Sequence, residues 1–488
     1  MKLRRPILVG GLGLSFSLWM LDSLQDSLVQ VGEFGLLSLL AVGGGLWLFQ
    51  KNRPKDSTQL LNGMPVDRET VEVAIAKTQS VVNQLTQEAE DSVEKRRIAS
   101  LQQEQVANLT AELDRQQILA TVTGGKLVGK TTLIEVLEQS VETGYRSSLH
   151  FQETSPLFVE AGEKSDADVF VEAQKSDLVL FLTNGDLTDT EFQALQQLKG
   201  ANQSTILVFN KQDQYLPDER VSVLQSLKQR VPSSVVAVAA SPATIKVRKH
   251  QEDGSIQEWL EVPAPDVQQL TQHLGEVLAQ QAQQLVWGTT MRKALLLKAE
   301  AKDLLNGIRR DRSVPIIEQY QWIAAAAAFA NPVPALDVLA TAAINAQMVV
   351  DLGKIYQQKL SLEQAQTVAG TMGSLMVKLG LVELSSKAIG IVLKSNAVTF
   401  VAGGLVQGVS AAYLTRLAGL SLVEYFQQQE IATNSGTALN LEKLGQNLQR
   451  VFQQSQQIGF LQGFVKQGVK RLLPEVPEAE LTAAETVA

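Results

Sequence analysis

The sequence contains no cysteine and only three histidines, which lie far apart at positions 150, 250 and 273. The lack of cysteine excludes disulfides, thiolate metal sites and thiol catalysis. Charged residues make up only 19% of the chain, against 45% hydrophobic residues, and the net charge of −8 argues against general nucleic-acid binding. At 488 residues, the chain is long enough for two or three domains.

Two stretches near the N-terminus lack charge altogether, residues 6–21 and residues 34–49. Each is slightly shorter than the ~20 residues that usually span a bilayer. Basic residues precede the first stretch and follow the second, and the loop between them carries only acidic charge, so the positive-inside rule places both ends in the cytosol. We therefore expect residues 1–55 to form a transmembrane helical hairpin in an integral membrane protein. A cleaved signal peptide and a pair of core helices of a soluble fold stay open as alternatives.

A helical segment is expected next, over residues 56–116. Val71, Ile75, Thr78, Val82 and Leu85 follow one another at spacings of three and four, which is a heptad-like stripe on a helix. One interpretation is a stalk or dimerising coil, and the other is a pair of helices packed against the C-terminal part of the chain. The stripe is too short to decide between them.

A P-loop pattern follows the apolar run 118–123 and precedes a helical start at Leu133. Backbone N–H groups of such a turn cradle a phosphate, and the helix dipole favours its negative charge. The lysine at position 130 adds a positive charge at the β- and γ-phosphates, and the hydroxyl at position 131 is a Mg²⁺ ligand, so these two are the candidate catalytic residues. The predicted phosphate-binding residues are Gly124, Gly125, Lys126, Leu127, Val128, Gly129, Lys130, Thr131 and Thr132.

A second motif, Asn210-Lys211-Gln212-Asp213, stands at the end of the apolar run 204–209. Its Asp can accept two hydrogen bonds from the N1–H and the exocyclic amine of guanine, a donor pair that adenine lacks. We expect Asn210 and Lys211 to brace the P-loop and the base plane, and Ala240 and Ser241 to form the loop that contacts guanine O6. Apolar runs separated by helical segments favour a mostly parallel sheet with the ligand at the strand C-termini.

With these motifs, residues 117–285 resemble the Era-like and dynamin-like GTPases. The P-loop, the N-K-Q-D element and the strand followed by residues 184–188 carry the resemblance. It implies a Ras-like G domain, over residues 117–288, that binds GTP or GDP with Mg²⁺ and hydrolyses GTP slowly unless stimulated.

The sequence departs from that family at several points. The D-x-x-G element is absent in its usual form, and we assign its strand to residues 157–162, with Glu160 as the residue that reaches Mg²⁺ through water beside Thr131. Thr143 and Thr154 are both candidates for the switch threonine. Leu127 stands where potassium-stimulated relatives carry Asn, so potassium activation is not expected. Turnover is therefore expected to be slow, partner-dependent or absent.

The C-terminal half is expected to be α-helical over residues 289–473, with a proline-containing break at residues 331–334. The uncharged run 397–414 includes small residues that allow close helix packing, namely Gly403, Gly404, Gly408 and Ala412. A buried central helix is favoured over membrane insertion for this run. Residues 325–425 look like an uncharacterised helical domain that is often fused to such GTPases in bacteria. Residues 474–488 form an acidic tail that we expect to be disordered.

These observations predict an α/β plus all-α protein, with a Ras-like P-loop G domain and a C-terminal helical bundle. The predicted function is a membrane-anchored GTP-binding protein that hydrolyses GTP slowly and thereby switches the packing or assembly of its helical domain. A non-hydrolysing GTP-binding scaffold and a dynamin-like, self-assembling membrane remodeller are the alternatives. The expected partners are membrane lipids, an unidentified protein and a second copy of the chain, without nucleic acid.

Overall fold

A computed structural model describes residues 66–89, 92–140, 148–159, 165–231, 234–250, 256–330, 334–394, 404–428, 440–456 and 458–472. The chain divides into two compact units. The first contains residues 118–280, and the second combines residues 67–117 with the chain from residue 281 onward.

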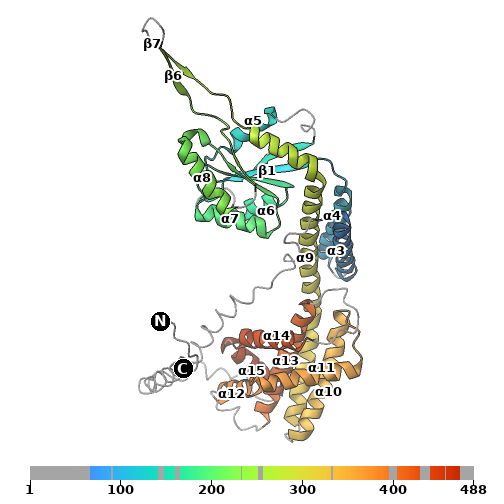
Figure 1. Cartoon of the computed structure of the whole chain (residues 1–488). Helices are drawn as coiled ribbons and strands as arrows, with labels where there is room; N and C mark the ends of the chain where they lie inside the picture. Colours follow the sequence, from blue (N-terminus) through green and yellow to red (C-terminus); the bar gives the residue numbers. More distant parts are fainter. Residues whose placement is uncertain are drawn as a thin grey trace, which may run out of the picture. The chain divides into compact units, whose positions relative to one another are not determined.

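The first unit is built on a five-stranded sheet in the order β2-β1-β3-β4-β5, in which every neighbouring pair is parallel (Figure 1). Its central strands are buried almost throughout, as expected for a parallel sheet that is covered on both faces. Because all strands run in one direction, their carboxyl ends and the loops that follow them meet at one edge. The strands are β1 (Ile118–Gly124), β2 (Leu149–Glu153), β3 (Leu178–Thr183), β4 (Thr205–Phe209) and β5 (Val235–Ala237).

Helices cover this sheet, and three of them share one apolar core. Val179 and Phe181 of β3 and Phe209 of β4 lie in a buried cluster with side chains of α6, α7 and α8. Thr188 begins α7 with a reciprocal capping box to Glu191, which fixes where the loop after β3 ends. The helices of this unit are α5 (Lys130–Ser140), α6 (Asp166–Gln174), α7 (Asp189–Gly200) and α8 (Pro217–Arg230), with a short 3₁₀ turn at Gln212–Gln214. The predicted α/β architecture is confirmed.

A separate antiparallel hairpin follows the sheet, made of β6 (Ile245–His250) and β7 (Ile256–Glu261). It forms a narrow ribbon that extends away from the five-stranded sheet (Figure 1). This hairpin is not predicted by any of the sequence patterns described above.

In the second unit, α3 (Arg68–Glu88) and α4 (Val93–Glu112) pack along α9 (Gln268–Ala330). The Thr78 hydroxyl of the heptad-like stripe donates to the Ala294 carbonyl at 3.1 Å, and Lys293 pairs with Glu112 at 2.7 Å. The stripe therefore faces α9 within this unit. The helix α9 continues through residues 288 and 289, where the sequence analysis had placed a domain boundary.

The remaining helices form a bundle around α13 (Leu405–Gln428), most of whose side chains are buried. A Cβ at Gly408 would lie 2.9 Å from the Ala325 carbonyl oxygen, and a Cβ at Gly419 would lie 2.7 Å from Ile317 Cγ1. The helices α13 and α9 therefore pack so closely at these two positions that only glycine fits without a shift of its neighbours. The described part of the predicted apolar run thus lies in the interior of a bundle. The surrounding helices are α10 (Pro334–Ile355), α11 (Leu362–Lys378), α12 (Leu381–Lys394), α14 (Leu441–Ser455) and α15 (Ile458–Leu472).

The structure contradicts the predicted localisation as an integral membrane protein. Among the residues that the structure describes, no helix combines the length and the apolar character needed to cross a membrane. Even the apolar α13 carries Arg416 and Glu424 and buries its apolar side chains against other helices. The hairpin predicted for residues 1–55 and the tail predicted for residues 474–488 lie outside the described residues.

Candidate functional site

The turn after β1 has the backbone shape that its glycines allow. Gly124 has φ +144° and Gly129 has φ +90°, values that side chains rarely tolerate, and Leu127 is also left-handed at φ 61°. A Cβ at Gly129 would lie only 2.5 Å from the Asn210 side-chain nitrogen. The two sequence motifs, about eighty residues apart, are thus in direct contact through this glycine.

Asn210 is the centre of this contact, and its side chain is almost fully buried. Its Nδ2 donates to the Val128 carbonyl at 2.9 Å, and its Oδ1 accepts from the Ala240 N–H at 3.1 Å. Its own N–H donates to the Thr183 carbonyl at 2.8 Å. Through its side-chain amide and its backbone N–H, this one residue therefore joins the P-loop, the end of β3 and the loop after β5, which are three segments at the same edge of the sheet.

The next residues of the motif complete the link. Lys211 adopts a left-handed conformation at φ 61°, and its Nζ donates to the Leu127 carbonyl at 2.8 Å. Asp213 Oδ2 accepts from the Ala243 N–H at 2.9 Å. In the part of the chain that the structure describes, Asp213 Oδ1 is buried and has no hydrogen-bond partner. A buried carboxylate oxygen without a donor is costly, so this atom is suited to receive one from a ligand.

Lys130 is the first residue of α5, and it is only 6% exposed. Its Nζ donates to the carbonyls of Gly125 at 3.1 Å and Gly124 at 3.4 Å. Burial lowers the pKa of Lys130, and the nearby Glu153 carboxylate raises it by a smaller amount. A cation that has lost its water in this way gains strongly from an anionic ligand.

Glu153 is a site residue that the sequence analysis missed. It ends β2, the strand next to β1, and its Oε2 accepts from the Thr131 hydroxyl at 2.7 Å. The structure therefore puts the carboxylate of Glu153 beside Thr131, while Glu160 lies outside the described residues. The sequence signal that could have identified Glu153 is an acidic residue at the end of a short strand. It was weak because Thr154-Ser155-Pro156 follows, so that the glycine of a D-x-x-G element is missing.

Of the two candidate switch threonines, only Thr154 lies within the described residues. Thr154 is buried, and its hydroxyl hydrogen-bonds the Thr123 hydroxyl of β1 at 2.8 Å, so it is occupied within the sheet. Thr143 lies outside the described residues.

The donor set at Thr131 and Glu153 fits a magnesium ion. Hydroxyl and carboxylate oxygens are the hard ligands that Mg²⁺ prefers, and Mg²⁺ is usually held by one or two protein groups together with substrate phosphates. In the described residues, no group of three or more His, Cys, Asp or Glu could hold a metal by itself. Thr131 and Glu153 would thus supply two of the oxygen ligands of such an ion, with phosphate oxygens and water as the others.

The other predicted nucleotide-binding residues line the same turn and loop. Lys126, Leu127 and Ser241 have exposed side chains, and Gly125 pairs with Leu157 in an isolated parallel bridge. Thr132 is half-buried in the first turn of α5.

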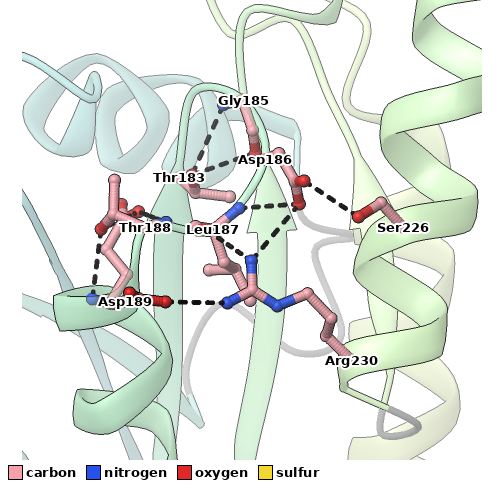
Figure 2. A network of polar contacts seen from close by, with 9 residues as sticks. Thr183, Gly185, Asp186, Leu187, Thr188, Asp189, Ser226 and Arg230 are labelled. Carbon is pink, nitrogen blue, oxygen red and sulfur yellow. Dashed lines mark hydrogen bonds and ion pairs between the residues drawn. The ribbon is translucent and has the colours of Figure 1, made fainter.

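A polar network fixes the loop after β3 to α8 (Figure 2). Ser226 donates to Asp186 Oδ2 at 2.9 Å, and the Arg230 guanidinium lies 3.8 Å from both Asp186 Oδ1 and Asp189 Oδ1. Arg230 also donates to the Leu187 carbonyl. The network therefore ties the C-terminal half of α8 to the loop after β3.

The segment that returns from the β6–β7 hairpin also reaches the site. Asp266 and Ala239 exchange two backbone hydrogen bonds of 2.9 Å, and Asp266 Oδ2 accepts from Gln212 Nε2 at 3.0 Å. Asp266 therefore holds both the N-K-Q-D element and the residue that precedes the Ala240-Ser241 loop.

Comparisons with known proteins give a match to a family model and matches to solved structures. A model for a domain of unknown function (DUF697) matches residues 296–457, which confirms the resemblance of the helical part to an uncharacterised domain. The bacterial dynamin GTPase LeoA from ETEC is 12% identical, with 86% of this chain and 96% of that chain covered, at a TM-score of 0.22. A TM-score of that size does not establish a common overall arrangement. No curated protein matches the chain.

Proposed function

We propose that this chain binds GTP and GDP with Mg²⁺ and hydrolyses GTP to GDP and phosphate. The P-loop receives the phosphates on its backbone N–H groups and on Lys130, and Asp213 receives the guanine base. The single observation that carries the proposal is the Asn210 amide, which bonds the P-loop and the Ala240 N–H at once. These two hydrogen bonds fix the distance between the proposed phosphate-binding turn and the proposed base-binding segment.

Guanine selectivity rests on the carboxylate of Asp213. One of its oxygens accepts from the Ala243 N–H, and the other is buried without a donor in the described structure. The N1–H and exocyclic amine of guanine supply donors to a carboxylate, whereas adenine offers an unprotonated N1 there. A buried acceptor that faces the wrong base loses about 1–3 kcal/mol, which is roughly a tenfold to hundredfold difference in affinity.

The hydrolytic part of the proposal rests on charge. Lys130 supplies a desolvated cation, and Thr131 and Glu153 would hold Mg²⁺, which neutralises charge that develops on the transferred phosphoryl group. Glu153, through the oxygen that now accepts from Thr131, orients that hydroxyl.

Binding of fluorescent GTP and ATP analogues to the full chain, with Mg²⁺, tests the proposal. We expect Asp213→Asn to lose guanine selectivity, with the neighbouring exposed Asp218→Asn as a matched control that retains it. Lys130→Ala should abolish phosphate release. Absence of guanine-selective binding in the unmodified chain would refute the proposed function.

A GTP-binding scaffold without turnover is the second candidate, and one observation favours it. After Glu153 the chain reads Thr154-Ser155-Pro156, and a proline has no backbone N–H to offer to a phosphate. Phosphate release under single-turnover conditions separates the two functions. Tight GTP binding without release, unchanged in Glu153→Gln, would identify the scaffold.

We also propose that the nucleotide state changes the packing or assembly of the helical unit. The support is covalent continuity, since α9 begins at Gln268, two residues after Asp266, and continues into the helices of the second unit. Hydrogen exchange over residues 296–457 should differ between the GTP-bound and GDP-bound protein. Identical exchange in both states would contradict this part of the proposal.

A further inference from the structure

The β6–β7 hairpin exposes apolar side chains on a sheet that has only two strands in the described structure. Every residue of β7 is exposed, with Ile256 at 54%, Trp259 at 40% and Leu260 at 73%. Two-stranded hairpins are marginally stable in water, and stability usually requires a third strand or a packed face. Both outer edges of this hairpin also present backbone donors and acceptors that can pair with another strand.

Charge is separated between the two strands. The strand β6 reads Ile-Lys-Val-Arg-Lys-His and carries only basic charge, whereas β7 reads Ile-Gln-Glu-Trp-Leu-Glu and carries only acidic charge. Inside the hairpin, Glu258 bonds both Lys246 and Arg248, so this face of the hairpin has two cations for one carboxylate.

From these features, we propose that the hairpin is a self-association element that pairs edge to edge with the hairpin of a second copy of this chain. Charge selects the pairing. Joining β6 to β6, or β7 to β7, sets like charges opposite each other, which destabilises a sheet, whereas joining β6 of one copy to β7 of the next sets opposite charges together.

The geometry of this pairing is heterologous. Each added copy uses one edge and leaves the other edge open, so the assembly extends in one direction instead of closing as a symmetric dimer. Adding a strand satisfies the edge groups of the hairpin and gives a four-stranded sheet with Trp259 and Leu260 near its middle. The occupant is therefore the chain itself, because it carries both complementary edges.

A charge-swapped variant provides the test. Lys246→Glu, Arg248→Glu, Glu258→Lys and Glu261→Lys in one chain reverse the net charge of each strand, with Lys249 left unchanged, and restore the ion pairs inside the hairpin. Because the chain has no cysteine, the exposed Gln225→Cys on α8 gives a single attachment point for donor and acceptor dyes. Energy transfer is then measured with full-length protein in three mixtures, which are unmodified with unmodified, swapped with swapped, and unmodified with swapped.

We expect the two like mixtures to associate with similar affinity and the unlike mixture to associate at least tenfold more weakly. Glu261→Lys alone, which leaves the ion pairs of Glu258 intact, should weaken self-association severalfold and provides a second measurement if the fourfold variant misfolds. Equal association in all three mixtures, or a monomeric unmodified protein at every concentration, would overturn the proposal. GTP affinity measured in the same samples separates this outcome from failure of the proposed function.

Discussion

Replacement of Gly129 by alanine tests whether the two motifs are joined as the structure shows. The new Cβ would lie 2.5 Å from Asn210 Nδ2 and would also adopt φ +90°, where side chains are strained. The strain costs about 1–3 kcal/mol. Displacement of the Asn210 amide leaves the Val128 carbonyl and the Ala240 N–H without partners, which costs about 1–3 kcal/mol for each group. We therefore expect a local loss of about 3–9 kcal/mol.

A double-mutant cycle separates the clash from the strain. Asn210→Ala alone removes the same two hydrogen bonds, at a cost of about 2–6 kcal/mol. In Gly129→Ala/Asn210→Ala the clash is gone and the hydrogen bonds are lost only once. The double variant should thus lose at least about 2 kcal/mol less than the sum of the single variants.

Native-state hydrogen exchange of β1 and β4 is the assay, because it reports the opening free energy of these strands and not that of the helical unit. Gly200→Ala is the matched control, since a Cβ at Gly200 meets no atom within 4 Å, and it should leave exchange unchanged. Additive effects of Gly129→Ala and Asn210→Ala would refute the contact between the motifs.

Three further predictions concern charged groups. Arg309→Met removes the closest partner of Glu88, which is only 12% exposed and bonded to Arg309 at 2.7 Å, and leaves it with Arg312 at 3.5 Å and the Gln357 amide. The loss should therefore cost the helical unit about 1–3 kcal/mol, and adding Glu88→Gln should recover most of it in urea unfolding. Burial raises the pKa of Glu424, so its stabilising protonated form is fully present below the ordinary pKa of a glutamate and is lost as the pH rises through the raised value. Glu424→Gln should accordingly be as stable as the unmodified protein at acidic pH and more stable at neutral pH, and equal stability at both pH values would contradict this reasoning. Burial lowers the pKa of Lys130, and bound phosphates should raise this pKa again, so GDP binding at alkaline pH should take up protons. Calorimetry in buffers of different ionisation enthalpy measures this uptake, and a binding heat that is independent of the buffer would refute the prediction.

The motifs at residues 124–132 and 210–213 could be located from the sequence because each is local. The glycine spacing, the preceding strand and the following helix stand together in a short segment, and a parallel sheet brings its carboxyl ends to one edge. The contact of Asn210 with Gly129 follows from that arrangement.

Glu153 could not be found in the same way. Its role depends on which strand lies beside β1, and that neighbour is decided by pairing between distant segments. The usual glycine is replaced by proline three residues later, so the local signal was lost and the assignment moved to Glu160. The β6–β7 hairpin was missed for another reason, because it buries no apolar face and therefore has no strong alternation.

The apolar run that contains Gly408 shows a third limit. Small and apolar residues at close spacing suit a helix in lipid and a helix inside a bundle equally well. The backbone of α9 lies within contact of Gly408, and this tertiary neighbour is absent from the local sequence.

The anchoring of the hairpin at both ends has a practical consequence. Ala243 is held by Asp213 where the hairpin leaves, and Asp266 is held by Ala239 and Gln212 where it returns. Each anchor is independent of the residues between them, so the length between them is free to vary without disturbing the fold. A small reporter domain grafted between residues 250 and 256 should thus leave the five-stranded sheet folded, which makes this position a natural insertion point.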